Sequence, residues 1–370
     1  NSTQKEKKET DDIYSFNILN AITKISNVKL RDKSGVFVGA RMGRPEKAKM
    51  RKIPGSPHGL FPVGKEGGRM KTFASALDVG FVNYPVKYFF CTTCNEQVLY
   101  SSCHKCGNKT EVKDLCRFCG SESGCEHFQN KTEEEIEAIK VPYKKTKINF
   151  REYFKSALKN LNTNQFADLI KGQEDLKNKS KYVERLEKAV LRAKHNIYVN
   201  KDGTIRYDAS EVPITHFRPK EIKVPWKKLK EIGYDKDIYG NELNNDDQVL
   251  EIYPQDILIP CYKDSSFEGA DSILFRTSKF IDELLVNLYG MEPYYNCKTP
   301  LDLVGKHTIV LAPHVSAGIL TRIIGFTETQ GLFAHPYVHC ATRRDCDGDE
   351  AAFFLLMDAF LNFSKTYLPA

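Results

Sequence analysis

Seven of the eleven cysteines of this 370-residue chain lie in one short segment, between Cys91 and Cys125. Six of these cysteines form three pairs with the spacing C-x2-C: Cys91 and Cys94, Cys103 and Cys106, and Cys116 and Cys119. This spacing points two thiolates at one metal ion from a tight turn. With His127 the segment offers eight ligands, enough for two tetrahedral zinc sites. The simplest pairing assigns Cys91, Cys94, Cys103 and Cys106 to one site, and Cys116, Cys119, Cys125 and His127 to the other.

Two alternatives stay open for this cysteine block. Cys125-x-His127 is an uncommon ligand spacing and His104 competes as a ligand, so one zinc ion with leftover free thiols would also fit. In either case the role is structural, because protein side chains fill all four positions around the ion. The chain shows no export signal, which favours metal ligation over disulfides and a reducing compartment. Core packing is expected for the four scattered cysteines: Cys261, Cys297, Cys340 and Cys346.

The length suits two or three domains, and no apolar run approaches the roughly 18 residues of a membrane helix. Both ends have the appearance of cuts, so we expect a fragment of a longer chain. The expected organisation is a disordered tail over 1–12, a β-region with a basic segment over 13–90, a zinc-binding module over 91–130, a helical region with a hairpin over 131–208, and a second β-region over 209–370.

Several local patterns predict individual elements. Thr132 and Glu135 fit a capping box at a helix start. Asp202-Gly203, between two β-rich runs, predicts a hairpin turn. Gly290 is placed to end an amphipathic helix. By the periodicity of apolar residues we expect a helix over 278–288, strands over 308–311 and 335–342, and a buried helix over 350–363.

Alternating carboxylates mark the segment 343–350, which reads Arg-Arg-Asp-Cys-Asp-Gly-Asp-Glu. On an extended backbone, alternate residues share one face, and Gly348 would let Asp345, Asp347 and Asp349 converge. Carboxylates together with substrate phosphates are the ligands that Mg²⁺ prefers. A solvated acidic turn and a structural calcium loop are the alternatives, although the Gly and Glu positions of an EF-hand are not met.

The positive charge of the chain is concentrated in one segment. The segment from Arg41 to Lys71 contains nine basic and two acidic residues. This excess of positive charge equals the formal net charge of the whole chain, +7. Dense Lys and Arg among glycines allow both backbone and cations to approach phosphates. The alternative is a solvated basic loop.

Five segments together resemble the large subunit of archaeal family D DNA polymerases. They are Gly39–Lys49, Asp237–Asn241, Gln255–Ile257, Leu311–Ile319 and Arg343–Glu350, in the family's order. The resemblance covers most of residues 28–370. It implies an α+β fold whose mainly β catalytic core has two double-psi β-barrels, with a zinc-binding module and a helical insertion. It also implies a cytoplasmic, nucleoid-associated archaeal protein that replicates DNA.

The resemblance further implies roles for particular residues. Asp347 and Asp349, assisted by Asp345, would hold two Mg²⁺ ions. Lys47 and Lys49 would neutralise the triphosphate of the incoming dNTP, and the expected contacts to triphosphate or nucleic acid come from Arg41, Arg44, Arg51, His314, Arg343 and Arg344. The two arginines before Asp345 could equally form salt bridges with the aspartates. The implied partners are primer–template DNA, dNTP, a small exonuclease subunit and a sliding clamp, and no membrane.

One departure from the family pattern leaves a choice of activity open. The family usually has Asn where this chain has Asp345, so the motif here is closer to that of RNA polymerases. Asp347 and Asp349 are therefore the firmer metal ligands. The expected function is a DNA polymerase in which the primer 3′-hydroxyl attacks the α-phosphate of the dNTP. RNA synthesis by a two-barrel polymerase, and a non-catalytic, zinc-dependent DNA-binding scaffold, are the alternatives.

Overall fold

The computed structural model describes residues 18–29, 46–122, 125–129, 131–262, 268–315 and 317–369. The chain divides into two compact units, residues 1–43 and 44–370. The first contributes helix α2 (Ile18–Ser26) to the described part, and the expected tail over 1–12 lies outside it. None of the described helices has the length and apolar character needed to cross a bilayer.

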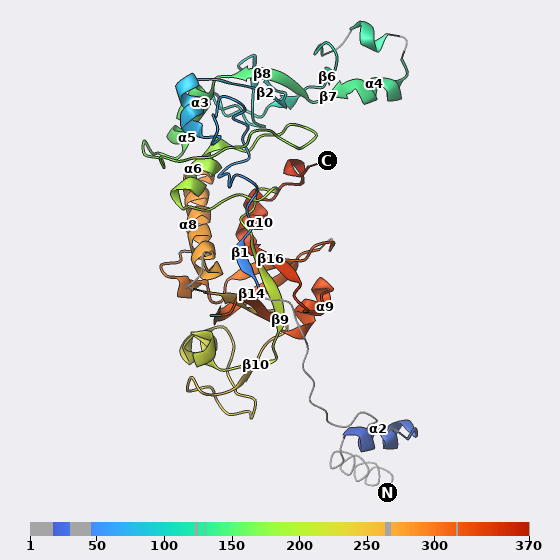
Figure 1. The fold of residues 1–370 in the computed structure, drawn as a ribbon, viewed down its shortest axis with the longest axis vertical. Helices are drawn as coiled ribbons and strands as arrows, with labels where there is room; N and C mark the ends of the chain where they lie inside the picture. Colours follow the sequence, from blue (N-terminus) through green and yellow to red (C-terminus); the bar gives the residue numbers. More distant parts are fainter. Residues whose placement is uncertain are drawn as a thin grey trace. The chain divides into compact units, whose positions relative to one another are not determined.

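A closed six-stranded β-barrel is the centre of the second unit (Figure 1). Around the barrel, neighbouring strands follow the order β9, β15, β12, β14, β13, β16, and β16 pairs with β9 to close it. The pairs β9–β15 and β12–β14 are parallel, and the remaining pairs are antiparallel. The strands are β9 (Tyr207–Pro213), β12 (Asp256–Pro260), β13 (His307–Leu311), β14 (Ile319–Thr327), β15 (Gly331–Ala334) and β16 (Glu350–Leu355).

A short seventh strand, β1 (Ala48–Met50), pairs with β9 but is not one of the six strands that close the barrel. It pairs antiparallel with the first half of β9, so that β9 lies between β1 and β16. The basic segment is therefore paired directly with β9, about 160 positions further along the chain. Through β9 it is linked to β16, about 300 positions further along. Figure 1 shows the three strands side by side in blue, yellow-green and red.

Three helices pack on the barrel. α8 (Ala270–Tyr289) contacts β1, β12 and β16, and buries an apolar stripe that includes Ile273, Phe280 and Leu284. It ends at Gly290, whose φ of 63° matches the predicted C-terminal cap. α10 (Leu356–Asn362) contacts β13 and β16, and α9 (Pro336–Thr342) contacts β9 and β14. A short 3₁₀ turn, η3 (Pro300–Leu303), packs against α8.

Residues 57–200 form a second layer of structure around an aromatic cluster. Phe73 packs edge-on against Phe150 and Phe154, with ring centroids 5.3 and 6.2 Å apart, and Phe61 lies 5.6 Å from Phe150. This cluster is continuous with the buried residues of the barrel. The helices are α3 (Phe73–Val79), α5 (Phe150–Asn160) and α6 (Leu186–Lys194), and the paired strands are β2 (Val82–Lys87) and β8 (Tyr143–Ile148).

The cysteine block lies between β2 and β8, on very short strands. One sheet contains β3 (Phe89–Cys91), β4 (Glu96–Val98) and β5 (Glu111–Val112), and another contains β6 (Leu115–Cys116) and β7 (Lys140–Val141). Helix α4 (Glu133–Ile139) follows a 3₁₀ turn, η1 (Glu126–Phe128), and starts with the predicted Thr132–Glu135 capping box. Strands this short bury little apolar surface, so this part of the chain needs another source of stability.

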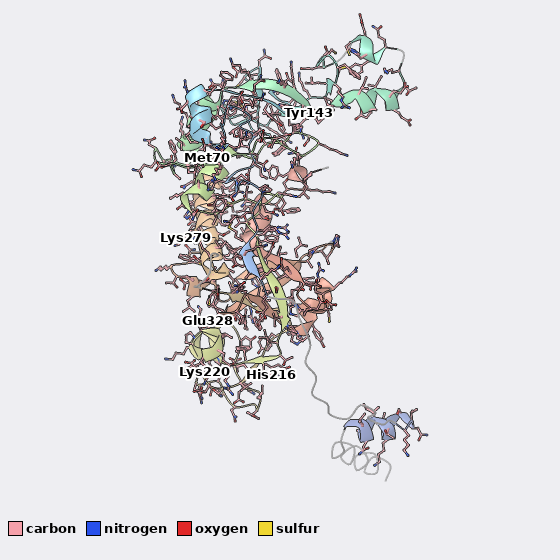
Figure 2. All side chains as sticks on the ribbon, viewed as in Figure 1. Met70, Tyr143, His216, Lys220, Lys279 and Glu328 are labelled. Atoms are coloured by element: carbon pink, nitrogen blue, oxygen red, sulfur yellow. The ribbon has the colours of Figure 1, made fainter. Side chains whose placement is uncertain are left out.

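A small module between β9 and β12 carries many lysines. It contains β10 (His216–Phe217), η2 (Pro219–Ile222), α7 (Trp226–Glu231) and β11 (Leu250–Glu251). Figure 2 labels His216 and Lys220 of this module, and Glu328 of the turn after β14. The Nζ of Lys223 donates to Oε1 of Glu328, which links the module to the turn after β14.

Three expectations about local structure are corrected. Residues 350–363 are not one helix: they form strand β16 and then helix α10. A strand that is buried on both faces is apolar throughout, so its pattern resembles that of a buried helix. Residues 336–342 are helix α9 rather than a strand, because His335 caps the N-terminus and Pro336 stands at the first helical position. The predicted hairpin at Asp202-Gly203 is a turn, with Gly203 at φ 93°, and only its second arm continues as a strand.

A fully buried ion pair joins the two layers. Arg192 donates two hydrogen bonds to the carboxylate of Glu184, at 2.7 and 2.8 Å, and one each to the carbonyl oxygens of His58 and Gly203. Below it, Asp358 of α10 accepts from the backbone N–H of Ile205 at 2.6 Å, and burial raises the pKa of Asp358 to about 6. The turn at 200–204, helix α6 and helix α10 are thus held by one polar network.

Removing one member of this pair should be costly. We expect Glu184→Gln and Arg192→Met each to lower the free energy of unfolding by about 3–5 kcal/mol, since each leaves a buried charge without its partner. The double variant should lose much less than the sum of the single variants. Urea unfolding followed by circular dichroism measures the cycle, and additive losses would contradict the assignment.

Candidate active site and metal centres

The three aspartates of the alternating motif come together in the loop between α9 and β16. One carboxylate oxygen each of Asp345, Asp347 and Asp349 lies within 4.8 Å of the others. The loop turns through left-handed backbone conformations at Arg343 (φ 57°), Cys346 (φ 59°) and Gly348 (φ 112°). Left-handed conformations at non-glycine residues persist only where the surroundings hold them in place. Asp345 is exposed and the other two aspartates are half-buried, so all three are accessible from solvent.

This group of carboxylates fits a divalent cation. Three negative charges at such distances repel one another unless a cation or protons offset them. Among the described residues one ion pair reaches the group, from Nη1 of Arg344 to Oδ2 of Asp349 at 3.5 Å. It balances one of the three charges. Hard oxygen ligands in this number are what Mg²⁺ takes, with water and phosphate oxygens in its remaining positions.

Lys47 and strand β1, together called the cationic strand, lie next to this loop. The backbone N–H of Lys47 donates to Oγ of Ser210 at 3.0 Å, and the N–H of Ser210 donates to the carbonyl oxygen of Lys47 at 2.9 Å. On the other edge of β9, Ser210 stands opposite Glu350, the residue after Asp349. Adjacent strands lie ~4.8 Å apart, so the backbones of Lys47 and Glu350 are separated by roughly 10 Å.

Two residues further along the pairing of β1 with β9, Lys49 and Arg51 lie beside the buried Asp208. Lys49 stands opposite Asp208, and Nε of Arg51 donates to Oδ2 of Asp208 at 2.7 Å. Burial raises the pKa of Asp208, while the nearby Arg51 guanidinium opposes that rise. A cavity of about 440 Å³ opens here, and its lining includes Lys49, Arg51, Lys52 and Asp208. Lysine and arginine side chains therefore border an open space beside the strand that carries Lys47.

The remaining predicted residues lie at the edge of the loop or outside the described part. His314 is exposed, in a turn after β13 with φ 63°, and the carbonyl oxygen of the preceding Pro313 accepts from Nη2 of Arg344 at 3.1 Å. Arg343 is exposed and caps α9. Arg41 and Arg44 lie outside the described residues. Arg343 and Arg344 were expected either to contact nucleic acid or to form salt bridges with the aspartates. Arg344 forms such a salt bridge, with Asp349.

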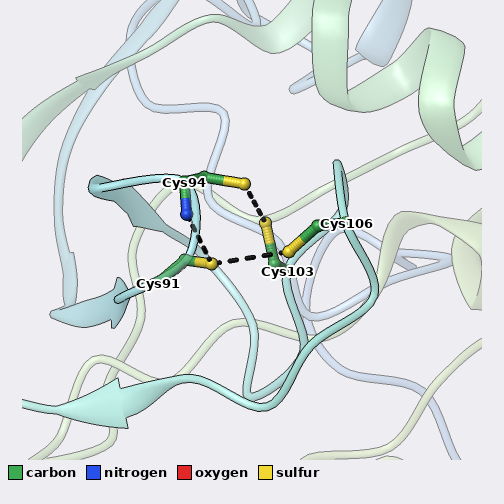
Figure 3. A group of neighbouring side chains, drawn as sticks. All are labelled: Cys91, Cys94, Cys103 and Cys106. Carbon is green, nitrogen blue, oxygen red and sulfur yellow. Dashed lines mark hydrogen bonds between the residues drawn. The ribbon is translucent and has the colours of Figure 1, made fainter.

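The first four cysteines form a compact group (Figure 3). Sγ of Cys91 lies 3.6 Å from Sγ of Cys106, and Sγ of Cys103 lies 3.9 Å from Sγ of Cys94. The backbone N–H of Cys94 donates to Sγ of Cys91, the largest of the effects that lower the pKa of this thiol to about 7. Four sulfurs at these distances match the ligand set of a tetrahedral zinc site. His104 instead packs against Tyr153, with the rings tilted by 39° and their centroids 4.2 Å apart, and it lies near Glu152.

The second group also comes together. One ligand atom each of Cys116, Cys119, Cys125 and His127 lies within 4.8 Å of the others. A hydrogen bond with Ser121 is the largest of the effects that lower the pKa of the Cys119 thiol to about 6. A lowered pKa favours the thiolate, the form that binds zinc. Of the scattered cysteines, Cys261 and Cys297 are buried as expected, whereas Cys340 is exposed and Cys346 is half-buried.

Several residues beside the aspartate loop were not predicted from the sequence. They are Asp208, Ser210 and Glu211 of β9, His339 and Thr342 of α9, and Glu350 of β16. All but Glu350 are buried. The signal that points to β9 is the run Asp208-Ala-Ser-Glu within a strand buried along most of its length, because polar side chains enter a core only with partners.

Two family models match this chain. The model described as "DNA polymerase II large subunit DP2, catalytic domain" matches residues 162–370, and the one described as "DNA polymerase II large subunit DP2, central domain" matches residues 1–124. The first match contains the barrel and the aspartate loop, and the second contains β1 and most of the cysteine block.

Curated relatives carry the same name. The chain is 43% identical over 397 residues to the DNA polymerase II large subunit of Nanoarchaeum equitans, covering 99% of this chain and 32% of that protein. The corresponding protein of Archaeoglobus fulgidus is 42% identical over 372 residues (98% and 31%), and that of Pyrococcus furiosus 40% over 358 residues (96% and 28%). The chain thus spans about a third of the length of these relatives. It belongs to the family of the archaeal DNA polymerase II large subunit.

Proposed function

We propose that this chain contributes the active site of a DNA-directed DNA polymerase. The observation that carries the proposal is the arrangement around β9. Strand β1 pairs with one edge of β9, and strand β16, which directly follows the loop with three carboxylates, pairs with the other edge. The names of the relatives, each a DNA polymerase II large subunit, support the same activity. We further propose that the closed barrel is one of the two double-psi barrels of a two-barrel polymerase. Its two parallel pairs, β9–β15 and β12–β14, support that topology.

In this proposal Asp347 and Asp349, with Asp345, hold Mg²⁺. When bound, the ions would activate the attacking hydroxyl and stabilise the leaving oxygen. The primer 3′-hydroxyl loses its proton to water, a bond forms between its oxygen and the α-phosphorus of the dNTP, the bond from that phosphorus to the bridging β-phosphate oxygen breaks, and pyrophosphate leaves. Arg344 orients Asp349 through its ion pair. His314 and Arg343, both exposed beside the loop, are placed to contact phosphate or template.

Lys47 and Lys49 act on the triphosphate. Both side chains are exposed: Lys49 lies in β1, which pairs with β9, and Lys47 directly precedes β1 and is held by hydrogen bonds between its backbone and Ser210. Positioning and charge neutralisation dominate phosphoryl transfer, so fixed cations lower the barrier without moving. Arg51 contributes a further charge, although Asp208 balances part of it. Arg41 and Arg44 stay in the proposal as additional contacts to nucleic acid.

We also propose zinc at both cysteine groups, in a structural role. Each group offers four ligands, and the strands around them are too short to be stable alone. Primer–template DNA, dNTP and a small exonuclease subunit are the proposed partners. "Large subunit" in the names of the relatives supports the small subunit, and the sliding clamp follows from the family resemblance.

The aspartates provide the main test. Asp347→Asn combined with Asp349→Asn should reduce primer extension by the complete polymerase at least about a hundredfold, because the amides cannot offset the charge of the cations. Extension is measured with dNTP and, in parallel, with NTP. The exposed Asp168→Asn is the matched control and should leave extension unchanged. Intact extension by the double variant would refute the site, and preferential use of NTP would favour RNA synthesis.

Lys47 provides a second test. Lys47→Met keeps the length of the side chain and removes its charge, so the KM for dNTP should rise by about tenfold with little change in DNA affinity. Lys47→Arg should restore part of the loss. The control is Lys65→Met, an exposed lysine of the same basic segment. Steady-state kinetics at saturating primer–template gives the KM, and an equal change in both variants would mean that the effect is one of general charge.

Zinc content tests the cysteine groups. The purified protein should contain about two zinc ions per chain, and Cys91→Ser with Cys94→Ser should contain about one, since each group loses its ion separately. Elemental analysis by mass spectrometry gives the count. The exposed, scattered Cys340→Ser should retain both ions. A single ion in the unaltered protein would support the alternative of one site with free thiols.

A further inference from the structure

Three buried polar side chains lie directly behind the aspartate loop. Glu211 of β9 is 2% exposed, His339 of α9 is 2% exposed, and Thr342, the last residue of α9, is 1% exposed. Neither the proposed metal ligands nor the proposed phosphate contacts include any of them. Polar groups so deeply buried cost free energy unless each has a partner.

Their contacts all converge on Glu211. Oγ1 of Thr342 lies 3.0 Å from Oε1 of Glu211 and 2.9 Å from the carbonyl oxygen of His339, and its proton can go to either acceptor. Nδ1 of His339 lies 3.5 Å from the same Oε1. Within the described residues, Oε2 of Glu211 and both ring nitrogens of His339 have no hydrogen-bond partner. A leucine would fill this space at a lower cost, so stability alone does not account for the carboxylate.

Glu211 also binds the other end of the loop. Its backbone N–H donates to the carbonyl oxygen of Asp349 at 2.9 Å. The loop leaves α9 after Thr342 and enters β16 at Glu350, so one residue holds its beginning through a side chain and its end through the backbone. The neighbouring Ser210 pairs with both Lys47 and Glu350. Two consecutive residues of β9 therefore fix the three carboxylates relative to the cationic strand.

We propose that Glu211, acting through Thr342, is a positioning residue that sets the spacing of Asp345, Asp347 and Asp349 and so the affinity of the loop for divalent cations. The inference rests on the proposed function, because it takes these aspartates as the metal ligands. The contact with Glu211 restrains Thr342 in the last turn of α9. The next residue, Arg343, has a left-handed backbone conformation that the surroundings must hold in place. Without the contact to Thr342, the start of the loop can shift while its end stays paired with β9.

The test compares divalent-cation affinity with thermal stability in the complete polymerase. Mn²⁺ serves as the probe, titrated by electron paramagnetic resonance, and primer extension gives kcat and KM. Thr342→Val keeps the shape of the side chain and removes the hydroxyl. We expect it to weaken Mn²⁺ binding by about tenfold and to lower kcat with an unchanged KM for DNA. Thr342→Ser restores the hydroxyl and should recover most of both. Glu211→Leu removes the oxygen that accepts from Thr342, so it should weaken Mn²⁺ binding and lower kcat about as much as Thr342→Val does.

Thr321→Val is the matched control. It removes a hydroxyl contact of 2.7 Å with Thr308, which is equally buried in the same barrel but stands beside the far end of β16. It should lower the midpoint of thermal unfolding about as much as Thr342→Val while leaving Mn²⁺ affinity and kcat unchanged. If Thr342→Val and Thr321→Val behave alike in every measurement, the role of Thr342 is purely structural and the inference is overturned.

The outcome also separates this inference from the proposed function. Mn²⁺ binding that is lost in the Asp347 and Asp349 variant but unaffected by Thr342→Val overturns the positioning role and leaves the metal site intact. Extension that survives the aspartate substitutions refutes the proposed site itself, whatever Thr342 does. Should Thr342→Val fail to fold, the smaller Thr342→Ala gives the same comparison with Thr342→Ser.

Discussion

Strand β9 is the element on which the rest of this structure depends. Its residues 207–209 pair with β1 along one edge and with β16 along the other, and its second half pairs with β15. It therefore closes the barrel and at the same time joins the cationic strand to the aspartate loop. Because each backbone hydrogen bond fixes register, main-chain geometry sets where the backbone of Lys47 and the end of the aspartate loop lie relative to each other.

Electrostatics at this site is arranged in two parts. Cations and carboxylates that touched directly would neutralise one another, as Arg51 and Asp208 partly do. With β9 between them, the backbones of Lys47 and Glu350 lie roughly two strand spacings apart. In the proposed function this leaves the lysines free for a negatively charged ligand and the aspartates for a cation. The buried Glu211 adds restraint from behind without entering the open side of the site.

The sequence was informative where spacing is local and less so where contacts are distant. Both cysteine groups and the convergence of Asp345, Asp347 and Asp349 follow from spacing of a few residues, and the structure brings them together. The strand over 308–311 and the cap at Gly290 were predicted for the same reason. Strand β16 was mistaken for a helix because burial on both faces removes the alternation that identifies a strand. The contact of Lys47 with Ser210 spans 163 positions, and no local pattern encodes it.

The long reach of these pairings also bears on how the protein is made. β1 is synthesised before β9, and β16 after every other strand of the barrel, so the barrel cannot close until β16 has left the ribosome. Until then β9 has an unpaired edge, which is a template for association with other chains. Pairings between distant segments also form slowly. The aspartate loop lies between α9 and the closing strand β16. Chains that stop before β16 therefore lack the pairing with β9 that holds the end of this loop.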